Sequence, residues 1–147
     1  MRILALSALA VVALAACSEP ATPAPEPAPA PAPAVLGGVD LGQPVRVLGT
    51  EPFWSVEITP QALHYTAVDN AEGVRATNAG PTIQGTTAVY AAAGADGTAL
   101  VVTLIATECS DGMSDRIYPL TARVEVGTAT LNGCAASTDF IMSQPAP

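Results

Sequence analysis

The side chains best suited to bind a ligand are polar groups in two short motifs. The first reads GTEPFW at residues 49–54, and the second reads CSDGMSDRIY at residues 109–118. Carboxylates bind cations, and the planar fork of an arginine matches an acidic group on a ligand. These residue types predict a small-ligand or ion site rimmed by Glu51 and Asp111, with Arg116 as counter-charge. The candidate binding residues are Glu51, Phe53, Asp111, Ser114, Asp115, Arg116 and Tyr118.

The same motifs also have a purely structural interpretation, which we favour. Asp111 begins a turn with the glycine that follows it, and Ser114 and Asp115 can cap backbone donors. Glu51 would then form an ion pair with Arg116. In this interpretation the motifs shape loops and bind nothing.

The sequence contains few side chains or motifs of the kinds that bind metals or catalyse reactions. Residues 111–115 lack the D-x-[DN]-x-[DN]-G pattern of a calcium loop, and Met113 with His64 is too sparse a set for copper. His64 is the chain's only histidine, and it falls on the polar face of a predicted strand. The chain contains no G-x-S-x-G motif, no catalytic pair of glutamates and no phosphate loop. We therefore predict that the protein is not an enzyme and uses no metal or cofactor.

The two aromatic residues of the first motif are expected to face opposite ways, because neighbours on a strand alternate. Trp54 shares its face with Val56 and Ile58 and is predicted to lie in the core. Phe53 is then predicted to lie at the surface, where an aromatic side chain can anchor a partner.

The elements that position these motifs are predicted to be strands. Apolar residues recur at every second position, and no run has the period of a helix. Asp96-Gly97 is the best hairpin signal, because glycine accepts the positive φ of a tight turn. We predict an all-β fold, a small antiparallel meander of about 7–8 strands closed as a barrel or a sandwich, with one disulfide. The predicted strands include residues 54–59, 63–67, 83–93, 100–105 and 120–126, of which 100–105 is apolar on both faces.

The N-terminus has the pattern of a lipoprotein export signal. Arg2 precedes fourteen largely apolar residues. This run is too short to cross a hydrocarbon core of about 30 Å but is typical of a signal peptide. It ends in LAAC at residues 14–17, which resembles the bacterial lipobox. We predict a lipoprotein signal peptide at residues 1–16 and acylation of Cys17, which would anchor the protein to the lipid bilayer. The alternative is an ordinary signal peptide cut nearby.

Residues 17–34 are predicted to be the acylated cysteine and a Pro/Ala-rich tether. Seven of residues 18–34 are proline, a composition that favours a semi-rigid polyproline II spacer. We expect one β domain at residues 35–147 with a loose C-terminal tail. Ser18, next to Cys17, favours the outer membrane over the inner membrane, by resemblance to the sorting rule of enterobacterial lipoproteins. The predicted location is the bacterial cell envelope, lipid-anchored and facing the periplasm.

The two remaining cysteines, Cys109 and Cys134, are most simply a disulfide in an exported protein. A redox-active or metal-binding thiol pair is the alternative. The long spacing differs from C-x-x-C, and no histidine lies near either cysteine in the sequence. We favour the disulfide.

Three motifs resemble a family of bacterial envelope proteins, mostly lipoproteins, that has no established activity. The motifs are GTEPFW at 49–54, CSDGMSDRIYP at 109–119 and LNGCA at 131–135. They are similar to the family patterns G-x-E-P-F-W, C-x-D-G-M-S-x-x-x-Y-P and L-x-G-C. Family members sometimes occur beside META-type domains. The resemblance covers residues 45–136 and implies a compact β domain with the two cysteines paired.

Composition narrows the class of function. The chain has 5 basic and 13 acidic residues, for a net charge of −8, which repels phosphate backbones and excludes nucleic-acid binding. We predict a membrane-anchored periplasmic lipoprotein, a non-enzymatic structural or partner-binding envelope module. The alternative is a small-ligand- or ion-binding β-barrel with a pocket near Glu51, Asp111 and Arg116. The expected partners are the bilayer, through acylated Cys17, and an envelope protein or a small ligand.

Overall fold

The computed structural model describes residues 34–143. The predicted signal peptide at 1–16, the acylation site Cys17, all but the last residue of the predicted tether at 17–34, and the tail at 144–147 lie outside the described residues. Among the described residues, no helix is long and apolar enough to cross a membrane.

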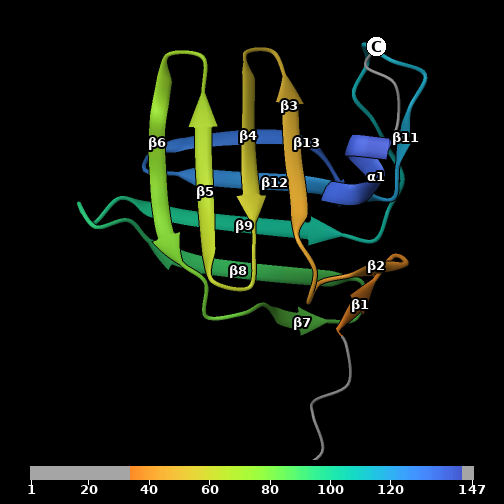
Figure 1. Cartoon of the computed structure of the whole chain (residues 1–147), viewed down its shortest axis with the longest axis horizontal. Coiled ribbons are helices and arrows are strands. Elements are labelled where there is room, and N and C mark those ends of the chain that lie inside the picture. Colours follow the sequence, from red (N-terminus) through yellow and green to blue (C-terminus); the bar gives the residue numbers. More distant parts are fainter. Residues whose placement is uncertain (1–33, 144–147) are drawn as a thin grey trace, which may run out of the picture. The chain divides into compact units, whose positions relative to one another are not determined.

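Most of the described chain forms one antiparallel sheet (Figure 1). Its order is β6-β5-β4-β3-β13-β12-β9-β8-β7, so two runs of neighbouring hairpins are joined where β3 pairs with β13. The strands of this sheet are β3 (Val45–Thr50), β4 (Phe53–Ile58), β5 (Ala62–Ala67), β6 (Asn70–Thr77), β7 (Thr82–Gln84), β8 (Thr87–Ala93), β9 (Ala99–Ile105), β12 (Leu120–Val126) and β13 (Ala129–Ser137).

Three smaller elements complete the fold. Strands β1 (Val35–Leu36) and β2 (Val39–Asp40) form a separate hairpin, and β10 (Cys109–Ser110) pairs with β11 (Ile117–Tyr118). The β10–β11 segment, residues 109–118, is an excursion between β9 and β12, and we call it the disulfide loop. A short helix, α1 (Thr138–Ser143), follows β13.

The all-β class and the antiparallel pairing are as predicted, but the strand count and the closure are not. The main sheet alone has nine strands, more than the 7–8 expected, and it curls without closing into a barrel. Strands β3–β6 cross over β8, β9, β12 and β13, and their inner faces share one core (Figure 1). Within the described residues, β6 and the end of β8 lie against each other, but the backbone pairing between them is the isolated bridge of Ala76 to Gly94. Because β7 has only three residues, it cannot supply the ladder that closure requires.

The core follows the predicted alternation. Trp54, Val56 and Ile58 on β4 are buried, and each fully buried aliphatic side chain contributes about 1.5–3 kcal/mol. On β9 the faces are unequal: the even-numbered residues 100–104 are fully buried, while Val101 and Ile105 are only partly buried. The strand is central, as expected, but the sheet covers only one of its faces completely.

Several elements were not predicted. The run expected at residues 83–93 is two strands, because Gly85 takes a positive φ of 56° and turns the chain between β7 and β8. Strand β6 is mostly polar and β13 is rich in small residues, so neither has a clear alternation. The helix α1 is shorter than two turns, and a helical period cannot be detected over six residues. The Asp96-Gly97 hairpin is confirmed, with Gly97 at φ 83°.

The disulfide between Cys109 and Cys134 is present, with a Cα–Cα distance of 5.5 Å. It joins the disulfide loop to β13. Close to it, Tyr118 and Ala136 form a second small core, which Leu48, Phe140 and Ile141 cover. The disulfide and this core hold the loop and α1 against the outer side of the sheet, where the candidate site lies.

Candidate functional site

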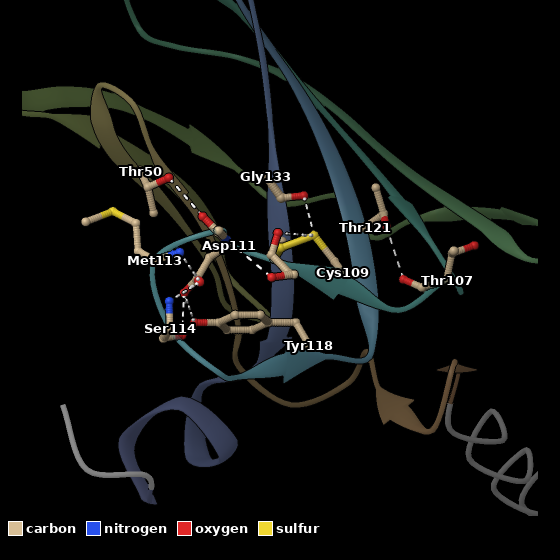
Figure 2. Close-up of a disulfide and its surroundings, with 12 residues drawn as sticks. Thr50, Thr107, Cys109, Asp111, Met113, Ser114, Tyr118, Thr121 and Gly133 are labelled. Carbon is tan, nitrogen blue, oxygen red and sulfur yellow. Dashed lines mark hydrogen bonds between the residues drawn. A yellow bond between two sulfur atoms is a disulfide. The ribbon is translucent and has the colours of Figure 1, made fainter. Parts of the chain in front are cut away.

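Asp111 is the centre of the hydrogen-bond network in the disulfide loop (Figure 2). Its Oδ1 accepts hydrogen bonds from the backbone N–H groups of Met113 and Ser114, at 3.0 and 2.8 Å. Its Oδ2 accepts from the hydroxyls of Ser114 and Tyr118, at 2.9 and 3.0 Å. The hydroxyl of Thr50 donates to the Asp111 carbonyl at 3.2 Å, which ties the loop to the end of β3.

These contacts shift the pKa values of both partners. Desolvation raises the pKa of Asp111, but the hydrogen bonds from Ser114, Met113 and Tyr118 together outweigh it and leave the pKa below its ordinary value. Desolvation and the neighbouring Asp111 carboxylate raise the pKa of Tyr118, while Arg116 opposes this effect. The pair is therefore held as a carboxylate and a neutral phenol.

The network supports a structural role for Asp111. All four of its contacts lie within the loop, so the carboxylate is an internal acceptor that shapes the turn. The side chain that caps the backbone N–H groups of this turn is that of Asp111. From the sequence, Ser114 and Asp115 were expected to cap them. The Ser114 hydroxyl does accept from the N–H of Arg116 at 3.3 Å, and Asp115 is exposed. Within residues 34–143, no group of three or more metal-ligating side chains is arranged to hold an ion.

A groove of about 770 Å³ lies beside this loop, over the ends of β3, β4 and β5. This volume is in the range of pockets that hold small ligands, about 300–1,000 Å³. We call it the β3–β5 groove. Its lining residues are Arg46, Leu48, Gly49, Thr50, Phe53, Trp54, Ser55, Thr66, Ala67, Val68, Ala71, Asp111, Met113, Arg116, Tyr118, Ile141 and Met142.

The lining contains four large apolar side chains that are unusually exposed. Phe53, Val68, Met113 and Met142 are 55%, 76%, 59% and 71% exposed. They come from the β4 start, the β5–β6 turn, the disulfide loop and α1, which are distant in the sequence. Apolar side chains gathered in this way mark a site for a ligand, a partner or a membrane.

Trp54 also borders the groove, but its side chain belongs to the core on the inner face of the sheet. Its side chain is 5% exposed and packs against Tyr65, with ring centroids 6.5 Å apart. Among residues 34–143 the indole N–H has no acceptor, and it is not one of the fully buried polar atoms. It lies over Gly49, another lining residue, where a Cβ would overlap Nε1. The indole therefore extends along the inner face of the sheet, from β4 over Gly49 of β3 to Gly133 of β13.

Arg46 contributes a positive charge to the lining. It lies on the outer face of β3, opposite Glu57 of β4. No ion pair or hydrogen bond within the described part of the chain engages its guanidinium. Its guanidinium could pair with an anionic group of a ligand in the groove.

The structure brings four of the seven candidate residues together in the groove: Phe53, Asp111, Arg116 and Tyr118. Phe53 is exposed and Trp54 is buried, as their alternation predicted. Glu51, Ser114 and Asp115 do not line the groove. Glu51 lies in the exposed turn between β3 and β4, where its peptide bond to Pro52 is cis.

Several lining residues had not been proposed from the sequence, chiefly Arg46, Val68 and Met142. Val68 directly precedes Asp69-Asn70, residue types that favour turns, and this neighbourhood is the one signal that the sequence offered. The other two lie on elements whose contact depends on the pairing of β3 with β13. A second cavity, of about 600 Å³, lies near the β1–β2 hairpin and shares Tyr118 with the groove.

Comparison of the chain with family models, with curated proteins and with solved structures finds no match.

Proposed function

We propose that the protein is a lipid-anchored envelope lipoprotein whose β domain is a non-enzymatic binding module. The β3–β5 groove is its ligand site. The observation that carries this proposal is the gathering of Phe53, Val68, Met113 and Met142, exposed and apolar, around one groove. The lipobox ending at Cys17 supports the location in the cell envelope, with the domain facing the periplasm.

The sequence predicted a site for either a small ligand or an ion, and the properties of the groove favour a small ligand. Asp111 and Arg116 line this groove, whereas Glu51, the third residue of the pocket predicted from the sequence, does not. The Asp111 oxygens, however, are occupied by four hydrogen bonds from the loop itself. An apolar lining with a few polar groups is typical of sites that bind organic ligands.

A native mass spectrum of the protein purified from its own envelope tests this function. We expect a carried small molecule in the spectrum, and its loss when Met113→Glu places a charge in the groove. The matched control is Ile83→Glu, since Ile83 is an exposed apolar residue on β7 that does not line the groove. Equal ligand loading in both variants would contradict the groove as the site.

A protein partner is the second candidate. The lining combines aromatic, methionine and arginine side chains, the types enriched at protein interfaces. Crosslinking in cells from a photoreactive residue at Val68 would then trap an envelope protein. A ligand mass in the native spectrum without any crosslinked neighbour would favour the small molecule.

A further inference from the structure

The methionines of the domain are gathered in the β3–β5 groove. Residues 34–143 contain two methionines, Met113 and Met142, and both line the groove. Met113 belongs to the disulfide loop and Met142 to α1, so the fold brings them to one site from distant parts of the chain. The third methionine of the sequence is Met1, in the predicted signal peptide. The thioether side chains of the described chain therefore lie at its candidate ligand site.

Both methionine side chains are open to solvent. Met113 is 59% exposed and Met142 is 71% exposed. The backbone N–H of Met113 donates to Asp111 Oδ1 at 3.0 Å, so the turn is held in place while the side chain projects away from it (Figure 2). A small oxidant therefore reaches each side chain in the folded protein, without local unfolding.

The other sulfur atoms and the indole of the described chain are less open to oxidation. Among residues 34–143, the remaining sulfur atoms belong to the Cys109–Cys134 disulfide, which is already oxidised. Trp54 is only 5% exposed. A mild two-electron oxidant is therefore expected to act first on Met113 and Met142.

Oxidation would change what the groove offers to a ligand. A methionine thioether is flexible and apolar, whereas its sulfoxide is polar. Met113 and Met142 supply exposed apolar surface to the groove together with Phe53 and Val68. An apolar ligand covering two sulfoxides would have to remove water from two new polar oxygens, which opposes binding.

We propose that Met113 and Met142 are an oxidation site, at which sulfoxide formation by a hydroperoxide weakens binding in the β3–β5 groove. This inference rests on the proposed function and adds its regulation. Each thioether sulfur attacks one peroxide oxygen, the O–O bond breaks, and the sulfur gives up two electrons and gains that oxygen. With hydrogen peroxide, the other oxygen leaves as water after proton transfer. The modification is reversible, because sulfoxide reductases restore the thioether.

The rate of sulfoxide formation tests the site itself. The full chain carrying Cys17→Ser, which removes the predicted acylation, is treated with hydrogen peroxide at neutral pH. Peptide mass spectrometry then follows the gain of one oxygen at each methionine. We expect Met113 and Met142 of the folded protein to oxidise within about threefold of their rates in the urea-unfolded chain. Saturation with Nile red, a neutral apolar dye that serves as the probe of the groove, should slow both rates.

The affinity for Nile red, measured after the peroxide is removed, tests the effect on binding. Oxidation of both methionines is expected to lower this affinity by about tenfold. The double variant Met113→Leu, Met142→Leu keeps apolar side chains of similar volume and forms no sulfoxide, so peroxide should not change its affinity. Adding Ile83→Met to this variant places an exposed thioether on β7, outside the groove, and its oxidation should not change the affinity either.

The outcomes separate the oxidation site from the proposed function. Rates in the folded protein more than about tenfold below those of the unfolded chain would overturn the oxidation site and leave the binding groove standing. A dye affinity that complete oxidation leaves unchanged, or lowers equally in the double leucine variant, would overturn the effect on binding. Dye binding that Met113→Glu does not weaken would place the dye elsewhere and contradict both proposals. The absence of dye binding would overturn the effect of oxidation, and the native mass spectrum would then decide the proposed function.

Discussion

The hydroxyl of Tyr118 donates a 3.0 Å hydrogen bond to Oδ2 of Asp111, seven positions earlier in the chain. The Tyr118 ring is buried beside Cys134 and meets the edge of the Phe140 ring, with centroids 6.4 Å apart. One side chain thus connects the polar network of the disulfide loop to the small core under α1. Because Asp111, Tyr118 and α1 residues also line the β3–β5 groove, the same connection fixes one wall of the candidate site.

The disulfide should supply a large part of the domain's stability. Cys109 and Cys134 are separated by 25 positions, and a crosslink of that span contributes about 3 kcal/mol in the chain-entropy account. Replacing both cysteines by serine is expected to lower the free energy of unfolding by about that amount in urea denaturation. Reductant should destabilise the unaltered protein and leave the double variant unchanged. Identical melting of the unaltered protein with and without reductant would contradict this expectation.

Acid should weaken the domain through Asp111. Its pKa lies below the ordinary 3.8 in the folded protein, so its contribution to stability is complete above 3.8 and is lost as the pH falls through the folded pKa. The free energy of unfolding of Asp111→Asn is therefore expected to decrease less between about pH 4 and pH 2 than that of the unaltered protein. Asp115→Asn, an exposed change in the same loop, is the control. Parallel pH profiles for the two variants would argue against the Asp111 network.

Two buried tyrosines should respond in opposite ways to loss of the hydroxyl. Tyr90 is buried and its hydroxyl has no hydrogen-bond partner among residues 34–143, so Tyr90→Phe is expected to leave stability unchanged or raise it by up to about 1 kcal/mol. Tyr118→Phe removes the bond to Asp111 and is expected to cost about 1–2 kcal/mol. Urea denaturation of both variants measures the contrast, and an equal loss in the two would contradict it.

Burial also raises the pKa of Tyr90 to about 12. An unfolded tyrosine ionises near its ordinary 10.0. The stability from this residue is therefore complete below pH 10 and is lost as the pH rises toward 12. Tyr90→Phe is expected to reduce the alkaline loss of stability between these values. A profile identical to that of the unaltered protein would show that Tyr90 does not ionise on unfolding.

Gly133 is expected to tolerate no side chain. A Cβ there would overlap the Leu48 carbonyl and lie 3.0 Å from the Trp54 ring. Gly133→Ala is predicted to cost about 1–3 kcal/mol and to shift Trp54 fluorescence as the indole is displaced. Gly42→Ala is the control, because Gly42 is exposed and its φ is not positive. Fluorescence that Gly133→Ala leaves unchanged would contradict the close packing of these strands.

Features that depend on near neighbours in the chain could be predicted. The opposite orientations of Phe53 and Trp54 follow from strand geometry, and the Asp96-Gly97 hairpin follows from the backbone freedom of glycine. The partnership of Cys109 and Cys134 followed from counting the cysteines of a chain that we predict to be exported. Each of these needed only spacing or composition, and each is confirmed.

Strands without a strong alternation could not be predicted. Strand β13 consists largely of small residues because it packs between β3 and β12, where Gly133 lies against Leu48 and Trp54. Close contact with the neighbouring strands therefore requires small residues along β13. The sequence of this strand then lacks the alternation of large apolar and polar residues by which a strand is detected. The polar β6 is an edge strand, paired along its length with β5 and bridged to Gly94 only at Ala76.

The sequence by itself determined the class of fold and the inward face of each alternating strand, because side-chain direction on a strand is set by the local backbone. It also placed Phe53, Asp111, Arg116 and Tyr118 among the candidate binding residues. Only the tertiary structure decided that these residues share a groove with Arg46, Val68 and Met142. That grouping arises when β3 pairs with β13 and the disulfide draws residues 109–118 onto the sheet. Contacts between such distant segments are formed by packing and crosslinking, for which no short stretch of sequence carries a signal.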